Sequence, residues 1–322
     1  MSAPIASASS PSTLVCGSMA FDTIMVFQDQ FKNHILPDHI HILNVSFLVP
    51  EMRREFGGCA GNIAYGLKLL GGNPRILATV GEDDGPYRSR LDQYGLDQSG
   101  VKTLPGTYTA QCFITTDHDD NQITAFHPGA MGRSHENHAR DVMAGVGLGI
   151  VGPDGRDGMM QNVQELADAK VPFIFDPGQA LPILSGDDLL KSLELATWCT
   201  VNDYELQLVC NKTGLSVEQI AGKLDALIVT LGAQGSRIYA GNQVIEVAAA
   251  RVDAVVDPTG CGDAYRGGLL YGIAQGWSLE KSARLASVMG ALKIAQRGPQ
   301  TYQPSRDEIA ARFAETFGER PW

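Results

Sequence analysis

The sequence predicts an α/β fold in which a mostly parallel central sheet is flanked by helices and carries a small β lid. Glycine accounts for 36 of the 322 residues and often follows short β-branched runs, where α/β proteins turn from strand to helix. Strand-like and helical segments alternate through the second half of the chain, which implies parallel pairing with right-handed crossovers. Two stretches in the first half break this alternation and indicate the lid.

The chain begins with a predicted βαβ unit. Residues 61–70 have the apolar spacing of a helix and lie between two β-branched runs that end in glycine, residues 13–17 and 75–81. Residues 1–12 are rich in Ala, Ser and Pro, so we expect them to form a disordered tail before a single domain of residues 13–322.

The predicted lid comes from two separate stretches. Residues 21–56 are rich in His and Pro and fit the βαβ pattern poorly. Residues 110–116 and 122–127 alternate between polar and apolar, and an acidic turn joins them as a hairpin. We expect the lid to comprise about residues 21–56 and part of 108–128.

The second half of the chain supplies most of the predicted sheet. The expected strands are residues 147–151, 171–176, 198–202 and 226–231, followed by a hairpin of 236–240 and 244–248. The expected helices include residues 159–169, 216–224, 260–275 and 278–296. In such sheets, ligands bind beyond the carboxyl ends of the strands.

Composition argues against several classes of protein. The net charge is -11, and there is no Lys/Arg cluster beyond Arg53-Arg54, so a nucleic-acid partner is not expected. No apolar run reaches the ~20 residues that span a bilayer, so no membrane association is expected. The six cysteines are scattered and no signal peptide is recognisable, which predicts reduced thiols in the cytoplasm.

The strongest chemical signal is D-P-T-G-C-G-D, residues 257–263, at the start of a predicted helix. Glycines on both sides of Cys261 can turn consecutive backbone N–H groups toward one point, and a helix N-terminus attracts anions. Asp263 would lie beside that anion, where a carboxylate can act as general base for a hydroxyl. An Asp-Pro turn followed by an ordinary acidic first turn is the alternative.

This segment resembles the C-terminal signature of the ribokinase-like (PfkB) family of sugar and nucleoside kinases, which reads D-x-T-G-x-G-D in the nucleoside branch. The resemblance implies a ribokinase-like fold and ATP as co-substrate. It implies that Asp263 deprotonates the acceptor hydroxyl. It also implies that the backbone N–H groups of Gly260, Cys261 and Gly262 hold the transferring phosphoryl group.

A second segment, G-G-C-A-G-N-I-A at residues 57–64, is similar to the family's N-terminal signature G-G-x-x-x-N. The similarity implies that Gly58 and Asn62 contact the substrate. Asp22 matches the family's early aspartate, whose carboxylate would accept hydrogen bonds from two ribose hydroxyls. Without the resemblance, the glycines could simply let a helix pack closely on a strand, and Asp22 could be a solvated turn residue.

Two further motifs concern Mg²⁺ and ATP. The letters N-D-Y-E resemble the family's N-x-x-E, which implies that Asn202 and Glu205 organise the waters around Mg²⁺. Plain helix N-capping is the alternative for this motif. The letters T-L-G-A-Q-G-S have the G-x-x-G form of the family's ATP loop, which implies nucleotide binding by Thr230, Gly232 and Gly235.

The resemblance also covers the late part of the chain. It implies that Ser287, Ala291 and Gly298 lie along the adenine of ATP. Asp257 and Thr259, with backbone near Gly298, match a monovalent-cation site of several relatives, which would hold K⁺.

Other motifs indicate less. His34, His39 and His41 match no zinc spacing and are interpreted as lid residues. The pattern G-x-x-x-x-G-K-[ST] is absent, and the glycines of residues 145–149 precede a strand, which is the wrong order for a dinucleotide fingerprint. Asp176, in an Asp-Pro-Gly turn, is assigned only to shaping the pocket.

Three features resemble the nucleoside branch of the family: the D-P-T-G-C-G-D segment, lid residues 34–56, and Gln111 together with residues 123–131. Gln111 is thereby implied in substrate binding. An apolar lid could cover a flat base, or its apolar residues could only cement the lid or a dimer; these residues are Phe47, Leu48 and Met52.

We therefore predict an ATP-dependent nucleoside kinase acting on the 5′-hydroxyl of adenosine, or of other purine nucleosides, with Asp263 as general base. Two alternatives remain open: a sugar kinase of the ribokinase or fructokinase type, and a non-catalytic nucleoside sensor. The sequence is compatible with a monomer or a lid-mediated homodimer.

Overall fold

The computed structural model describes residues 11–35, 44–119 and 121–322. Its centre is a nine-stranded sheet in the order β13-β12-β11-β10-β9-β8-β1-β4-β5. The strands are β1 (Ser12–Cys16), β4 (Pro74–Val80), β5 (Asp97–Thr103), β8 (Val146–Val151), β9 (Phe173–Phe175), β10 (Trp198–Asn202), β11 (Ala226–Thr230), β12 (Ser236–Ala240) and β13 (Gln243–Val247). Strands from β5 to β11 in this order pair in parallel, and only β12 and β13 are antiparallel. The predicted mostly parallel sheet is confirmed.

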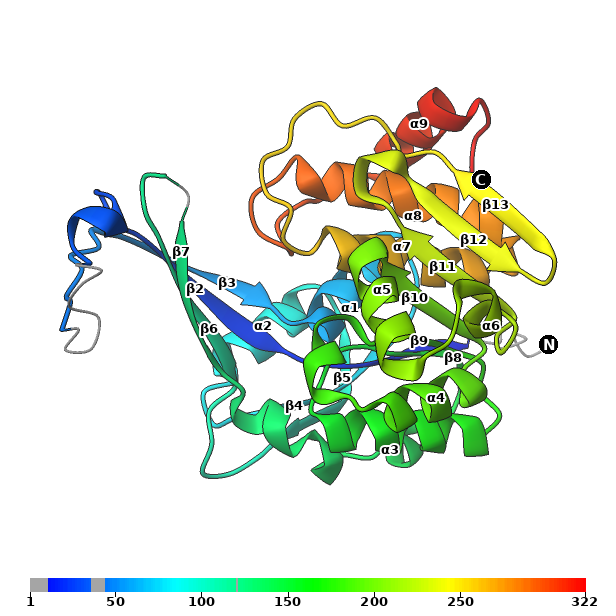
Figure 1. Cartoon of the computed structure of the whole chain (residues 1–322), viewed down its shortest axis with the longest axis horizontal. Coiled ribbons are helices and arrows are strands. Elements are labelled where there is room, and N and C mark those ends of the chain that lie inside the picture. Colours follow the sequence, from blue (N-terminus) through cyan, green and yellow to red (C-terminus); the bar gives the residue numbers. More distant parts are fainter. Residues whose placement is uncertain (1–10, 36–43, 120) are drawn as a thin grey trace, which may run out of the picture.

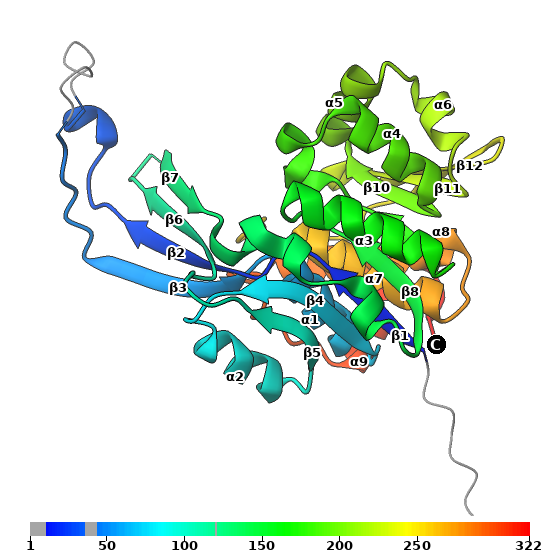
Figure 2. The same cartoon turned by 90° about the horizontal axis from the view of Figure 1, so that it is seen from below.

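Helices cover both faces of this sheet (Figures 1 and 2). Alternate side chains of the strands feed two cores: Val15 packs toward one layer of helices, and Leu14 packs toward the other. The first layer contains α1 (Cys59–Leu69), α2 (Gly85–Gln93), α7 (Cys261–Ala274), α8 (Leu279–Ile294) and α9 (Arg306–Phe317). The second contains α3 (Arg156–Asp168), α4 (Gly186–Leu195), α5 (Asp203–Thr213) and α6 (Val217–Ala221). Short 3-10 helices occur at Phe31–Asn33, Gly129–Glu136, Ala139–Val142, Gly178–Ile183 and Gly232–Gln234.

A second sheet forms the lid and projects from one end of the body (Figure 1). It has four strands in the order β3-β2-β6-β7. They are β2 (Ala20–Val26), β3 (Glu51–Gly57), β6 (Ala110–Thr116) and β7 (Gln122–His127). The lid therefore contains both strands of the predicted hairpin, and the predicted small β lid is confirmed.

Several elements differ from the sequence prediction. Strand β1 includes Ser12, which is buried, so the predicted tail is too long by at least this residue, while residues 1–10 lie outside the described residues. His39 and His41 also lie outside them. The sequence analysis missed α2 and β5 because both are mostly polar; α2 buries only Tyr87 and Leu91. It also missed α4 and α9.

No helix among the described residues is long and apolar enough to cross a membrane.

Glycines of α7 let its backbone touch two neighbouring helices. A Cβ added at Gly268 would lie 2.7 Å from the Cα of Ala286 in α8. One added at Gly267 would lie 3.0 Å from the backbone nitrogen of Leu67 in α1. Because these distances leave no room for a side chain, glycine fixes how closely α7 packs against α1 and α8.

Gly268→Ala should lower the free energy of unfolding by about 1–3 kcal/mol, because the added methyl group would overlap Ala286. Gly85→Ala in α2 is the matched control, since a Cβ there meets nothing within 4 Å. Its effect should stay within about 0.5 kcal/mol. Chemical denaturation measures both variants, and equal stability of Gly268→Ala and the wild type would contradict the close packing of α7 on α8.

Candidate active site

Asp263 lies in the first turn of α7, beside Asn62 of α1. The Nδ2 of Asn62 donates a hydrogen bond to Oδ2 of Asp263 at 2.8 Å. The pKa of Asp263 is raised to about 6, mainly by burial; the Asn62 bond and Arg266 lower it, and the charges of Asp176 and Glu205 add to the rise. At neutral pH this carboxylate is ionised but binds a proton more readily than an ordinary aspartate, which suits a general base.

Asn62 is itself held by a chain of buried hydrogen bonds. Its Oδ1 accepts from Nε2 of Gln300 at 3.0 Å, and the same nitrogen donates to the hydroxyl of Tyr87 at 2.8 Å. The Tyr87 hydroxyl in turn donates to the carbonyl of Gly57 at 2.7 Å. Gln300 and Tyr87 therefore turn the Asn62 amide so that its Nδ2 faces Asp263. The sequence analysis identified neither residue, because a single Gln or Tyr forms no motif.

Gly260 forms the turn that starts α7. Its φ is +77°, and an added Cβ would lie 2.6 Å from the Cβ of Pro299, so only glycine fits. The first N–H groups of a helix have no acceptor within it, and together they form a position that attracts an anion. The Cys261 N–H donates to the Pro258 carbonyl at 3.2 Å, so the turn already engages one of the three predicted phosphoryl-binding amides.

Asp22 comes from the lid. It pairs in register with Glu55 on β3 and with Cys112 on β6, so these side chains share one face of the lid sheet. The pKa of Asp22 is raised to about 6, mainly by burial and also by the charges of Glu55, Asp263 and Asp257. The Asp22 carboxylate therefore lies close enough to the start of α7 for its charge to interact with that of Asp263.

A buried ion pair joins α7 to the residue that follows β9. The Nη2 of Arg266 donates to Oδ1 of Asp176 at 2.7 Å, and its Nε contacts the other carboxylate oxygen. Its Nη1 donates to the Gly262 carbonyl at 3.1 Å. Burial would lower the pKa of Arg266, but Asp176, Glu205 and Asp263 hold it above its usual value. The sequence analysis missed Arg266, although it lies only three positions after Asp263, the last residue of the quoted motif.

Asn202 and Glu205 form a capping box at the start of α5. The Oδ1 of Asn202 accepts from the Glu205 N–H at 2.7 Å, and Oε2 of Glu205 accepts from the Asn202 N–H at 2.8 Å. Burial and the charge of Asp176 raise the pKa of Glu205. Helix capping thus accounts for the N-D-Y-E motif. The Glu205 carboxylate is also one of the negative charges that interact with Arg266.

The donor set fits a hydrated Mg²⁺. Among the described residues there is no group of three or more His, Cys, Asp or Glu side chains that could hold a metal ion. Mg²⁺ keeps several waters and binds few protein groups directly, so it does not require such a group. The charges of three carboxylates, Asp176, Glu205 and Asp263, interact with the Arg266 cation, and a hydrated divalent ion would offset their excess charge.

The predicted ATP loop is the turn between β11 and β12. Gly232 has a φ of +57°, and a Cβ there would meet nothing within 4 Å, so it faces open space. Gly235 is close to the neighbouring strand instead, since an added Cβ would overlap the Val247 carbonyl oxygen. Thr230 ends β11 and donates to the Val201 carbonyl at 3.4 Å. Of the three predicted residues, Gly232 is therefore the exposed one, and the other two shape the loop.

Ser287 of α8 holds the segment that follows β13. Its Oγ accepts from the Ala250 N–H at 2.7 Å and donates to the Ala248 carbonyl at 3.3 Å. The Ser287 hydroxyl thus makes both of these hydrogen bonds within the protein. That Ser287 lies beside adenine stays a prediction from the family resemblance.

The residues predicted for a monovalent cation meet at Asp257, which also contacts a lysine ammonium. The carboxylate of Asp257 accepts from the N–H groups of Thr259 at 2.9 Å and Gly298 at 2.8 Å. Burial would raise the pKa of Asp257, but these two bonds hold it below its ordinary value. The Nζ of Lys293, near the end of α8, donates to the carbonyls of Asp257 at 2.7 Å and Gln296 at 3.2 Å.

Two predicted substrate residues make contacts within the protein. Gln111 is one position before Cys112 on β6, so it lies on the opposite face of the lid sheet from Asp22. There its Nε2 donates to Oδ2 of Asp83 at 3.1 Å. Gly58 is the N-cap of α1, with a φ of +84°, and an added Cβ would lie 2.6 Å from the backbone just before β2. Gly58 therefore serves the close packing of α1 against the lid entry.

The apolar lid residues fit the second of the two predicted roles, cementing the lid, better than covering a base. Phe47 packs against Phe27 and Phe31, with ring centroids 4.8 and 5.1 Å apart, and so cements the lid. Met52 pairs with Met25, which places it on the lid face opposite Asp22. Neither side chain is beside the carboxylates.

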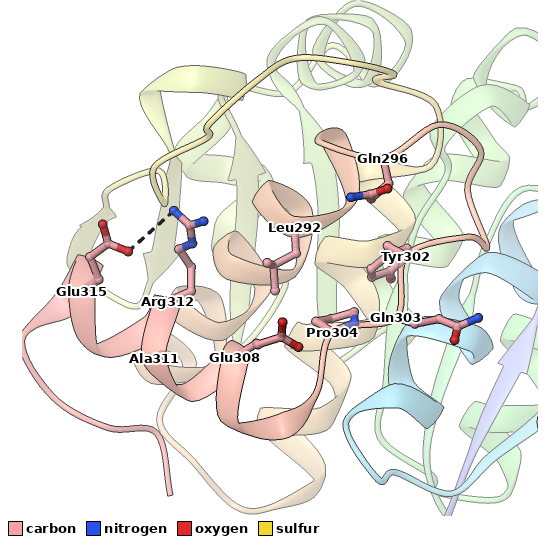
Figure 3. Close-up of a pocket in the computed structure, with 9 residues that line it drawn as sticks. All are labelled: Leu292, Gln296, Tyr302, Gln303, Pro304, Glu308, Ala311, Arg312 and Glu315. Carbon is pink, nitrogen blue, oxygen red and sulfur yellow. Dashed lines mark ion pairs between the residues drawn. The ribbon is translucent and has the colours of Figure 1, made fainter.

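A pocket of about 440 Å³ lies away from these residues, between α8, α9 and the loop that joins them (Figure 3). It contains none of the predicted site residues. Its lining is polar on one side, where Arg312 and Glu315 form an ion pair at 3.6 Å. The residues that line it are Leu292, Gln296, Tyr302, Gln303, Pro304, Glu308, Ala311, Arg312 and Glu315.

A carboxylate with raised proton affinity at a helix N-terminus that attracts anions is the arrangement a phosphotransferase with an alcohol acceptor needs, and the relatives described below make this class plain. The three-layer fold with its β lid is ribokinase-like. The chain belongs to the pfkB family of carbohydrate kinases, whose model matches residues 21–306.

Relatives of this chain cover nearly its whole length. The nucleoside kinase of Methanocaldococcus jannaschii is 31% identical over 272 residues, which span 84% of this chain and 89% of that protein. The nucleoside kinase of Methanothermobacter thermautotrophicus is 29% identical over 314 residues, which span 96% and 97%. The structure of Burkholderia thailandensis nucleoside kinase in complex with inosine is 57% identical, with a TM-score of 0.86 and coverage of 96% and 99%. A further structure of that protein is a complex with ADP-inosine.

Asp22→Asn should stabilise the protein at pH 8 but not at pH 4. The pKa of Asp22 in the folded protein is about 6, above its ordinary value of 3.8. Ionised Asp22 therefore destabilises the folded state. The destabilisation is complete at a pH above the pKa of Asp22 in the folded protein, and it disappears at a pH below the pKa in the unfolded chain. The difference in Tm between variant and wild type should grow from pH 4 to pH 8. The exposed Asp168→Asn controls for the loss of one negative charge, and a pH-independent difference for Asp22→Asn would contradict the pKa shift.

Proposed function

We propose that this protein is an ATP-dependent nucleoside kinase that phosphorylates the 5′-hydroxyl of a purine nucleoside. The observation that carries the proposal is the hydrogen bond from Asn62 to Asp263, which orients a carboxylate of raised pKa at the start of α7. Relatives that are nucleoside kinases, at 31% and 57% identity, support a nucleoside as the acceptor.

The ribose would bind between Asp22 and Asp263. An ionised carboxylate only accepts hydrogen bonds, so Asp22 suits the adjacent 2′- and 3′-hydroxyl groups as donors. With that edge of the ring held by the lid, the 5′-hydroxyl on the other side of the ring can reach Asp263. This position explains why the two carboxylates lie within range of each other's charge.

Asp263 would take the proton of the 5′-hydroxyl as its oxygen attacks the γ-phosphorus of ATP, and ADP would leave. The N–H groups at the start of α7 would stabilise the charge on the transferring phosphoryl group. Arg266, fixed by Asp176, lowers the pKa of Asp263 and so helps to keep the base ionised at neutral pH.

ATP would approach the same end of α7 from the exposed turn at Gly232. Asn202 and Glu205 would hold Mg²⁺ through its waters, and the bound ion would neutralise charge on the ATP phosphates. This use of Glu205 leaves its capping bond in place, because a carboxylate has further lone pairs.

The lid face that carries Asp22 favours a nucleoside, with its flat base, over a free sugar as the substrate. Cys112 pairs with Asp22, and Phe126 pairs with Cys112, so both share this face, as does Ile24 two residues along β2. Phe126 is 52% exposed and therefore has surface that a base can cover. We propose adenosine and inosine as substrates, since a relative of 57% identity binds inosine.

Asp263→Asn should lower turnover by at least about 10²-fold while nucleoside binding is mostly retained, because the amide cannot accept the proton. Asp187→Asn is the matched control, since Asp187 is an exposed aspartate in the first turn of α4. It should leave turnover unchanged. ADP release and nucleoside titration measure the two effects, and near-normal turnover of Asp263→Asn would remove it from the role of base.

The substrate class is tested with Mg-ATP and a panel of adenosine, inosine, guanosine, cytidine, ribose and fructose. We expect turnover with the purine nucleosides. Turnover with ribose or fructose alone would keep the mechanism but make the protein a sugar kinase. Saturable nucleoside binding without ADP release from any acceptor would make it a sensor.

A further inference from the structure

Lys293 is a fully buried lysine that the phosphoryl-transfer mechanism does not use. Its side chain runs from the last turn of α8 to the loop before α7. The Nζ donates to the carbonyl oxygens of Asp257 and Gln296, and the Asp257 carboxylate oxygen Oδ1 is 4.0 Å away. Burial lowers the pKa of Lys293, while the charges of Asp257, Cys261, Glu55 and Asp263 oppose that shift. The negative groups around it favour the ammonium form.

The acceptors around this ammonium are those of a monovalent-cation site. Backbone carbonyls and a carboxylate are hard oxygen ligands, and K⁺ needs several of them at once. Here two carbonyls already accept hydrogen bonds from Nζ, and the Asp257 carboxylate accepts two backbone N–H groups. A free cation at the same oxygens would meet the positive charge of Lys293. The residues therefore do not fit the K⁺ that the family resemblance implies.

The position of Lys293 joins two loops that build the active site. The loop that starts at Asp257 leads directly into the Gly260 turn and α7. The loop that contains Gln296 continues to Pro299, which packs against Gly260, and to Gln300, which orients Asn62. One ammonium thus ties the anion-binding turn to the segment that supports the general base.

We propose that Lys293 acts as a built-in monovalent cation, so that phosphoryl transfer by this protein needs no K⁺. The ammonium fixes the Asp257 loop and adds positive charge beside the start of α7. It therefore takes over a role that a dissociable ion would otherwise have at these oxygens. This inference rests on the proposed kinase function for its activity readout.

The first experiment compares wild-type turnover in potassium chloride with that in N-methylglucamine chloride at equal ionic strength. N-methylglucamine is too large to enter a buried cation site, so it supplies ionic strength only. We expect the two rates to agree within about twofold. A rate that rises tenfold or more with K⁺ would overturn the proposal.

The second experiment replaces the lysine. Lys293→Ala removes the ammonium and leaves space for an ion, so turnover should fall by about 10²-fold in N-methylglucamine. Adding K⁺ should raise the turnover of Lys293→Ala at least tenfold. Lys281→Met is the control on the same helix, where Nζ lies 4.4 Å from the Trp277 ring centre, and it should keep wild-type turnover. Full turnover of Lys293→Ala without K⁺ would contradict the proposal.

A thermal-unfolding measurement decides the proposal independently of activity. K⁺ should raise the Tm of Lys293→Ala relative to N-methylglucamine, because it binds only the folded site, and should leave the wild-type Tm unchanged. If Lys293→Ala does not fold, Lys293→Met and the wild-type comparison still apply. A K⁺-dependent rise in wild-type Tm would overturn the proposal. Wild-type protein that turns over no acceptor would refute the proposed function and leave this readout intact.

Discussion

The close packing of α7 against α1 determines the geometry of the active site. Gly267 has no side chain, so the two helix backbones approach until Asn62 reaches Asp263 at 2.8 Å. Asn62 and Asp263 are 201 positions apart in the chain and belong to two different sequence motifs. Gly268 fixes the same helix against α8, which carries Lys293. The base, its orienting amide and the buried ammonium therefore depend on one tightly packed helix.

The distribution of charge explains how an acidic protein can bind a polyphosphate. The chain has a net charge of -11, and its active site adds several carboxylates within range of one another. Two buried cations, Arg266 and Lys293, are both next to the start of α7, where the helix N-terminus also favours negative charge. Positive potential is thus concentrated at the point where the phosphoryl group would be transferred.

The sequence was informative where local pattern decides structure. The glycine-rich start of α7, the alternating strands and the hairpin of the lid are all local features, and the structure contains each of them. The pairing of Arg266 with Asp176 and the contacts of Lys293 depend on segments far apart in the chain, so no local pattern reveals them. Gln111 shows a different limit: in a strand, one position decides which face a side chain occupies.

The most direct test is a crystal structure with inosine or adenosine and ADP bound. The account predicts the 5′-oxygen within about 2.6–3.2 Å of the Asp263 carboxylate, the reach required of a general base. It also predicts the ribose 2′- and 3′-hydroxyls on Asp22. A nucleoside bound with its 5′-hydroxyl turned away from α7, or bound in the pocket between α8 and α9, would contradict the account.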